Sequence, residues 1–249
     1  MIYRFMQAYP SQASPVDHIL SRHMTLTDVT ISPDLTPDIA SKIPAHQHVY
    51  AHLRTLILFG DLAPGQAVTI QGLTSLLNAG MTPVREALRR LIAEGALIHQ
   101  GNRRVVVPSL TAADTEELGF IRKTLEPELA RRATTRMTPE GLDRLTQTDV
   151  LLNSAIARGD IGEYLTRNYQ FHAQIYSCAD APITSETVDR LWLRFGPSLR
   201  VVCGRFGTLN LPDKHADLLA AFQNRDAAAA AHAMAEDVAQ GMRQIQASL

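Results

Sequence analysis

Residues 82–91 of this chain read TPVREALRRL, and this stretch decides the fold. Thr82 and Pro83 are typical of a helix start, with threonine as the N-cap and proline in the first turn, where its missing N–H costs nothing. The apolar residues that follow recur at helical spacing, and Glu94-Gly95 ends the pattern. We therefore predict an amphipathic helix that buries one face and leaves its arginines on another.

Two shorter helical patterns precede this helix. Apolar residues recur at helical spacing from His46 and stop at Gly60, and a second apolar pattern covers residues 70–77. The breaker Asn78-Ala79-Gly80 separates the second pattern from TPVREALRRL. The stretch 46–94 therefore predicts three helices, with a turn before the third.

A strand signal follows the third helix. Residues 96–100 and 103–107 are short runs on either side of Gly101-Asn102, a pair typical of a β-hairpin turn. Helix, helix, turn, helix and hairpin is the order of a winged helix-turn-helix, so we assign that fold to residues 46–108.

Everything after Pro108-Ser109 has a helical period. The predicted helices are 111–136, 138–158, 160–178, 184–202, 212–224 and 226–247. Residues 1–45 contain five prolines and keep no long period, so we expect a poorly ordered arm with a short helix near 17–23. The predicted fold class is mostly α: the winged helix-turn-helix at 46–108, then an all-α helical bundle at 109–249.

Composition restricts the classes of function. The formal net charge is −1, but residues 46–108 hold six basic against three acidic residues, so the basic excess is local to the segment that would meet DNA. Cys178 and Cys203 lie in no metal-binding spacing, which favours reduced thiols in a cytoplasmic protein. We expect no membrane span, because no apolar stretch approaches ~18–20 residues. We expect no signal peptide, because residues 1–15 lack a continuous apolar region.

Several polar residues of the third helix and of the hairpin are candidates for DNA contact. A recognition helix presents its N-terminal residues to base edges, and arginine can grip either guanine or a phosphate. The alternative interpretation is a solvated basic face with a weak Glu86–Arg90 pair. The candidates are Thr82, Arg85, Arg89, Arg90, Asn102, Arg103 and Arg104.

Residues 49–108 resemble the DNA-binding domain of the GntR family. The resemblance rests on Val49-Tyr50-x-x-Leu53-Arg54, Leu62-Ala63-Pro64-Gly65, TPVREALRRL, Glu94-Gly95 and Asn102-Arg103. It implies operator contacts at Thr82, Arg85, Arg89 and Arg103, and we add Arg54. The family usually has Ser-Arg before Thr-Pro and Gly after Asn-Arg, whereas this chain has Gly80-Met81 and Arg104. We expect an altered operator preference from the missing arginine.

A second constellation lies in the helical part. Asn168 and His172 are four residues apart and share a helix face, while His215 and Asp237 lie on later helices. An amide oxygen, two imidazoles and a carboxylate that converge inside a bundle could bind Zn²⁺, Ni²⁺ or Mn²⁺. The spacing alone leaves open that these are ordinary surface or core residues.

Residues 111–247 resemble the helical ligand-binding domain (FCD type) of the FadR subgroup, through Ile121-Arg122-x-x-Leu125-Glu126, Asn168-x-x-Phe171-His172, the His215 segment and Asp226 to Asp237. The resemblance implies a divalent metal at Asn168, His172 and His215, and at a position where the family has a third His and this chain has Asp237, still an oxygen ligand. His232 is a substitute ligand if the helix register differs. The resemblance also implies a small carboxylate effector held by Arg122, whose alternative role is a salt bridge to Glu126.

These patterns together predict a DNA-binding transcription regulator, not an enzyme. The resemblance implies a homodimer, often a repressor, that a small carboxylate releases from double-stranded operator DNA. Two alternatives remain at this point: an α-helical metalloenzyme that uses the predicted metal site, and an interaction module that binds DNA without sequence preference.

Overall fold

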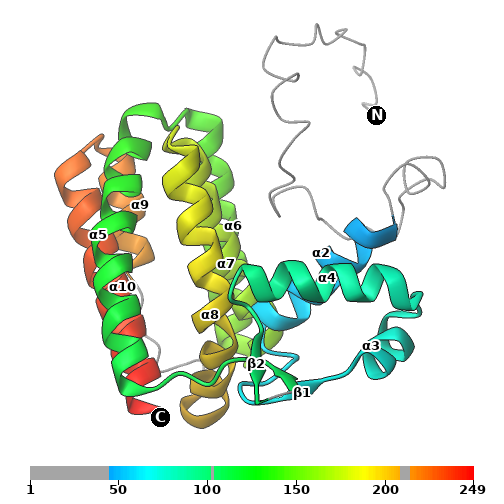
Figure 1. Cartoon of the computed structure of the whole chain (residues 1–249). Helices are drawn as coiled ribbons and strands as arrows, with labels where there is room; N and C mark the ends of the chain where they lie inside the picture. Colours follow the sequence, from blue (N-terminus) through cyan, green and yellow to red (C-terminus); the bar gives the residue numbers. More distant parts are fainter. Residues whose placement is uncertain (1–44, 102–103, 208–213) are drawn as a thin grey trace, which may run out of the picture. The chain divides into compact units, whose positions relative to one another are not determined.

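A computed structural model describes residues 45–101, 104–207 and 214–249 of the chain. Its described part is mostly helical, with a small sheet in the N-terminal portion and a helical bundle in the C-terminal portion (Figure 1). The predicted arm, with its short helix near 17–23, lies outside the described residues, as do Asn102 and Arg103.

The N-terminal portion is a winged helix-turn-helix. Its elements are α2 (Ala45–Leu58), β1 (Ala67–Val68), α3 (Ile70–Leu77), α4 (Met81–Ala93), β2 (Ile98–Gln100) and β3 (Arg104–Val106). Helix α4 packs on α2 and α3, so the three helices share one apolar core. Leu53, Ile57, Leu91 and Leu97 are fully buried in this portion.

The wing is a three-stranded antiparallel sheet in the order β1-β3-β2. The hairpin of β2 and β3 is the predicted one, with Gln100 opposite Arg104. Strand β1 was not predicted: it pairs Ala67 with Val106 and is only two residues long, too short for an alternating pattern to show in the sequence.

The start of α4 differs from the prediction. Gly80 is the N-cap, with no side chain to bond the first turn, and Thr82 is the second helical residue. Thr82 is therefore exposed on the helix and does not cap it. Helix α3, by contrast, is capped by Thr69 and ends at Asn78 in the left-handed conformation.

Six helices follow the wing, close to the predicted spans. They are α5 (Ala112–Arg136), α6 (Pro139–Arg158), α7 (Ile161–Cys178), α8 (Pro182–Phe206), α9 (His215–Gln223) and α10 (Ala227–Ala247). Helix α8 continues four residues beyond the predicted end at 202 and includes Gly204, since an interior glycine costs a helix only about 1 kcal/mol.

Local side chains cap these helices and apolar residues fill the space between them. Thr111 and Asp114 form a capping box at the start of α5, and Thr138, Asp160 and Asp226 cap later helices. Helix α5 packs along α10, and α6 along α7. Within the described ranges, no helix is both long enough and apolar enough to cross a bilayer.

Candidate DNA-binding surface and metal centre

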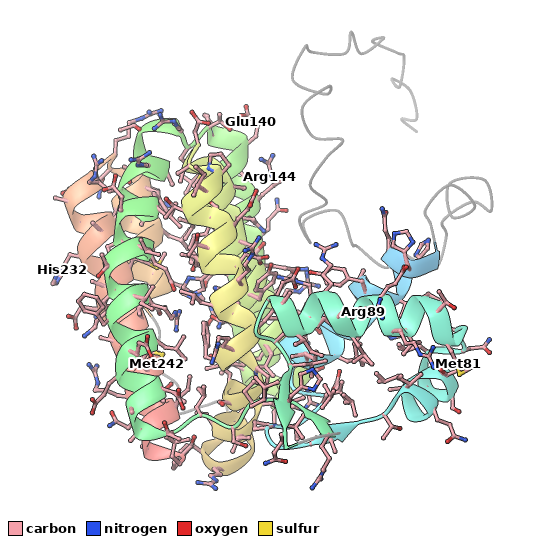
Figure 2. All side chains as sticks on the ribbon, in the orientation of Figure 1. Met81, Arg89, Glu140, Arg144, His232 and Met242 are labelled. Carbon is pink, nitrogen blue, oxygen red and sulfur yellow. The ribbon has the colours of Figure 1, made fainter. Side chains whose placement is uncertain are left out.

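Helix α4 has a buried apolar face and an exposed, mostly polar face. Val84, Ala87, Leu88 and Leu91 are buried beneath it. Figure 2 shows Met81 at the start of the helix and Arg89 further along it. The exposed residues of its first three turns are Met81, Thr82, Arg85, Glu86, Arg89 and Arg90. The apolar underside thus fixes the helix while a surface with three arginines stays accessible.

Arg90 differs from the other two arginines because it is already engaged. Its Nε lies 2.9 Å from Glu94 Oε1, and its guanidinium lies 3.7 Å above the ring of Tyr50. The Tyr50 hydroxyl donates to both oxygens of Glu94, at 3.0 and 2.8 Å. Burial, with the Glu94 carboxylate beside it, raises the pKa of Tyr50 to about 12. The predicted pair of Arg90 with Glu86 is not the one formed.

The other basic residues that were predicted to contact DNA are not all exposed. Arg104 is exposed on β3, at the wing, while Arg103 lies outside the described residues. Arg54 is only 6% exposed, and its Nη2 lies 2.6 Å from Asp189 Oδ2. The structure therefore does not place Arg54 among the exposed arginines, and its predicted DNA contact has no support here.

The bundle brings three of the predicted metal ligands together. His172 on α7, His215 on α9 and Asp237 on α10 each offer one ligand atom within 4.8 Å of the others. His172 Nε2 lies 3.3 Å from Asp237 Oδ2. That separation is close to the ~3.3 Å expected between two ligands whose bonds to one zinc ion are ~2.0–2.1 Å. Two imidazoles and a carboxylate are a donor set that suits Zn²⁺, Ni²⁺ or Mn²⁺.

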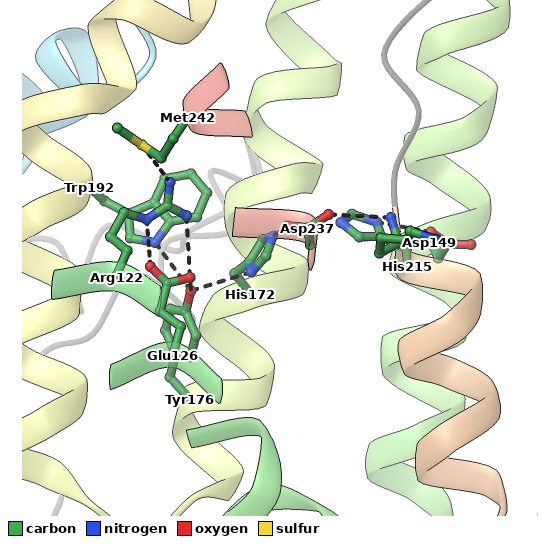
Figure 3. A network of polar contacts seen from close by, with 10 residues as sticks. Arg122, Glu126, Asp149, His172, Tyr176, Trp192, His215, Asp237 and Met242 are labelled. Atoms are coloured by element: carbon green, nitrogen blue, oxygen red, sulfur yellow. Dashed lines mark hydrogen bonds and ion pairs between the residues drawn. The ribbon is translucent and has the colours of Figure 1, made fainter. Parts of the chain in front are cut away.

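The second nitrogen of each imidazole has a partner that sets its tautomer (Figure 3). His215 Nδ1 lies 3.2 Å from Asp149 Oδ1, and a carboxylate can only accept there. The Tyr176 hydroxyl donates to Glu126 at 2.7 Å, so its oxygen accepts from His172 Nδ1 at 3.3 Å. Each ring thus uses Nδ1 for its outer partner and keeps Nε2, which in His172 faces Asp237, as the atom that could bind a cation. Such outer partners are typical of histidine metal ligands.

Asp237 is kept ionised in this position. Burial opposes its charge, but the hydrogen bond and positive charge offered by His172, with His215 nearby, outweigh burial and hold the pKa of the carboxyl far below its usual value. The backbone N–H of Lys214 also donates to Asp237 Oδ1 at 3.3 Å. An anionic carboxylate beside two imidazole nitrogens is a set of side chains that could hold a divalent cation, which would replace the proton that His172 shares with Asp237.

Arg122 lies beside this centre in a closed ion pair. Its Nε donates to Glu126 Oε1 at 2.5 Å and its Nη2 to Oε2 at 3.2 Å, and both side chains are buried. The guanidinium also lies 3.9 Å from the centre of the Phe195 ring. The structure thus contains the salt bridge that the sequence left open as the alternative role for Arg122.

The other sequence candidates occupy different positions. Asn168 is half-buried on α7, one turn before His172, and stays a predicted fourth ligand. His232 is exposed and lines a surface cavity of about 340 Å³ between α9 and α10. His172, His215 and Asp237, the metal triad, do not line this cavity. Sequence reasoning missed Asp149 and Tyr176, whose roles arise from contacts between helices and leave no local pattern.

Comparisons with known proteins identify both portions. Residues 45–107 match "Bacterial regulatory proteins, gntR family", and residues 117–240 match the "FCD domain". The HTH-type transcriptional regulator McbR of Escherichia coli (strain K12) is 30% identical over 193 residues, covering 76% of this chain and 87% of McbR. The HTH-type transcriptional repressor RspR of the same organism is 27% identical over 209 residues, covering 81% of this chain and 90% of RspR.

Solved structures agree with these matches. The structure of E. coli McbR/YncC superposes with a TM-score of 0.76 at 28% identity, covering 82% of this chain and 97% of that one. A putative GntR regulator from Rhodococcus sp. RHA1 shares the fold, with a TM-score of 0.67 at 22% identity, over 82% and 98% of the two chains. These relatives are transcription regulators and not enzymes. The chain therefore belongs to the GntR family of HTH-type transcription regulators, in the FadR subgroup that carries an FCD domain.

Proposed function

We propose that this regulator binds a specific operator through α4 and the wing, and that a small carboxylate, bound through a divalent cation at His172, His215 and Asp237, controls that binding. The proposal that α4 binds DNA rests on one observation. Arg85 and Arg89 are exposed on a helix whose opposite face is buried in the core. Such a helix can enter a major groove without unfolding its own support.

The residues proposed to contact DNA are expected to contribute unequally to binding. Thr82, Arg85 and Arg89 would reach base edges or phosphates from α4, since their side chains are exposed along its first turns. Arg104 and Arg103 would contact the backbone from the wing. Arg90 would contribute less, because its guanidinium is already shared with Glu94 and Tyr50.

The proposed sensor depends on the cation more than on Arg122. The charge of Arg122 is balanced by Glu126, whereas a divalent cation at the triad would keep charge to attract an anion. When bound, the cation would supply a Lewis-acidic position for an effector carboxylate. Arg122 stays a candidate second contact, but an effector would have to compete with Glu126 for its guanidinium.

Repression and dimerisation complete the proposal. The relative RspR is named a transcriptional repressor, and we extend that sign of regulation to this chain. A homodimer would present two α4 helices to two half-sites about one DNA turn apart. An effector that binds more tightly to an arrangement of the dimer that cannot bind DNA would shift the population toward that arrangement. The difference between its affinities for the two arrangements sets the size of this shift.

Selection of bound duplexes from a random DNA pool, repeated with candidate carboxylates, tests the proposal. We expect a two-half-site sequence to be enriched and at least one small carboxylate to reduce the enrichment. Arg89→Gln is expected to reduce enrichment, while Glu86→Gln on the same exposed face serves as the matched control. Recovery of no common sequence would instead favour a module that binds DNA without sequence preference.

Metal content tests the sensor separately. Purified wild-type protein dialysed against zinc is expected to retain about one ion per chain by elemental analysis, following the donor set of a three-residue site. The double variant His172→Ala/His215→Ala should retain none, and His232→Ala should behave like wild type. Unchanged metal content in the double variant would remove the triad from the proposal.

A further inference from the structure

One carboxylate joins the helical bundle to the winged helix-turn-helix. Asp189, on α8, has its Oδ2 2.6 Å from Arg54 Nη2 on α2, and its Oδ1 accepts the Tyr169 hydroxyl of α7 at 2.5 Å. Arg54 is nearly fully buried, while Asp189 keeps 40% of its side chain exposed. The Asp189 carboxylate raises the pKa of Arg54 although burial opposes this, so the charge persists in the contact.

The two helices joined by this ion pair are in close contact along α8. A Cβ added at Gly196 would lie 2.5 Å from the Leu58 carbonyl oxygen of α2, so only glycine fits there. Further along α8, Arg200 donates to the Phe59 carbonyl oxygen at 3.2 Å and lies 3.3 Å from Asp61. Contacts at three positions of α8 therefore hold α2 and the turn that follows it.

Within the helical bundle, packed aromatic rings connect the Arg54–Asp189 ion pair with the metal triad. The rings of Tyr169 and Trp192 meet edge to face with centroids 5.3 Å apart. Trp192 in turn lies 5.3 Å from the ring of His172, centroid to centroid. Both rings are buried, and a close-packed interior transmits strain, so a displacement of His172 is expected to reach Tyr169 through Trp192.

On the DNA side, α2 holds the end of the recognition helix. Tyr50 lies one turn before Arg54 on α2, and its hydroxyl bonds to Glu94 at the C-cap of α4. Arg90 of α4 stacks on the Tyr50 ring. Helix α2 thus contacts α8 through Arg54 and α4 through Tyr50.

We infer that Asp189 is a positioning residue, which acts through Arg54 to couple the state of the metal triad to the placement of α4. The inference rests on the proposed function and adds the residues that carry its coupling. Packing alone does not establish coupling, so the test measures the coupling itself.

Trp192 provides the readout, because it is the one tryptophan in the sequence and contacts both His172 and Tyr169. Full-length protein is titrated with zinc alone, and then with the duplex enriched by the selection above, while Trp192 emission is followed. The dissociation constant for that duplex is measured in zinc and in chelator. In wild type we expect zinc to change this constant by about fivefold or more, and the duplex to change Trp192 emission by linkage.

The decisive variant is Arg54→Met/Asp189→Leu, which removes the pair without leaving one buried charge unpaired. We expect its zinc affinity without DNA to stay within about twofold of wild type, while the zinc effect on duplex binding falls below about twofold. The duplex should then no longer alter Trp192 emission.

Two milder variants cover the case in which that protein folds poorly. Tyr169→Phe removes only the hydroxyl that bonds to Asp189, and is expected to reduce the zinc effect partly. Gly196→Ala forces α2 and α8 apart and should reduce it as well. Arg131→Gln, which alters an exposed pair with Glu128 within α5, is the matched control and should leave the zinc effect unchanged.

Wild-type protein is measured first, so that the two ways to fail are distinct. A wild type that shows neither duplex preference nor a zinc effect overturns the proposed function, and this inference with it. A wild type with a zinc effect that Arg54→Met/Asp189→Leu and Tyr169→Phe both retain in full overturns the inference alone. Asp189 would then be a structural contact only.

Discussion

Glu126 carries its charge where no solvent reaches. Its side chain is fully buried, and its two oxygens accept from Arg122 and from the Tyr176 hydroxyl. Desolvation of two charges is costly, and the pair offsets this cost only while both partners are present. The tautomer of His172 depends on the same hydroxyl, so Glu126 links core stability with the metal centre.

The Glu126→Gln variant isolates this dependence. Loss of the carboxylate leaves the Arg122 guanidinium buried without a counter-charge, which typically costs about 3–5 kcal/mol of unfolding free energy. Urea unfolding followed by circular dichroism measures the change. Glu128→Gln, on the exposed side of the same helix, is the control and should change stability little. Equal stability of the two variants would show that the buried pair is not needed.

The reactivity of the buried Cys203 thiol gives a second prediction for a single residue, and this prediction depends on pH. Burial raises the pKa of its thiol to about 11 although Arg200 opposes this, so the reactive thiolate is scarce at pH 8 and increases as pH rises. We expect iodoacetamide to label Cys203 at pH 8 at least about a hundredfold more slowly in native than in urea-unfolded protein. Equal rates would place this thiol in solvent.

At the scale of elements, the N-terminal turn of α4 has an unusual chemistry. Met81 is 58% exposed at a turn where recognition helices present side chains to bases. Its thioether offers no hydrogen to a guanine, and it is complementary to the apolar methyl group of thymine. We therefore expect the operator to contain a thymine that Met81 contacts.

Replacement of each operator thymine by uracil, which lacks that methyl group, measures the contact. We predict that one replacement weakens wild-type binding about fourfold, the equivalent of the ~0.8 kcal/mol for one buried CH₂ group. The same replacement should leave Met81→Ala unaffected, and Met81→Arg should gain affinity for guanine at that position. A wild type insensitive to every replacement would exclude the contact.

The helices could be predicted because their signals are local. The spacing of Val84, Ala87, Leu88 and Leu91 defines α4 whatever surrounds it. Strand β1 could not be predicted because two residues have no period. The sequence favours Thr82 as the N-cap because nothing in it shows that Gly80 already has the cap conformation. Local patterns specify helix faces, but they do not specify which residue opens a helix.

The prediction of the candidate metal site required information that local patterns do not contain. His172, His215 and Asp237 lie on three helices, and the family resemblance, not their spacing, suggested that they meet. Asp149 and Asp189 could not be predicted, since each acts across helices that are far apart in the sequence. The family pattern predicts a DNA contact at Arg54, whereas its burial against Asp189 is a contact that the sequence alone does not show.

At the scale of the whole molecule, a cation at the triad would tie α7, α9 and α10 together. Any ligand that binds only the folded state stabilises it by mass action. Zinc at 100 times its dissociation constant is therefore expected to raise the unfolding free energy by about 2.7 kcal/mol, measured in urea against a chelated sample. His172→Ala/His215→Ala should show no such gain, whereas His232→Ala should show all of it.

The proposed regulation depends throughout on one interaction, in which the exposed arginine face of α4 binds a duplex in a sequence-dependent way. The most direct measurement compares the dissociation constants of zinc-loaded protein for the enriched duplex and for a scrambled duplex of equal composition, at about physiological salt. We expect the enriched duplex to bind about a thousandfold more tightly or better. Equal constants for the two duplexes would contradict it.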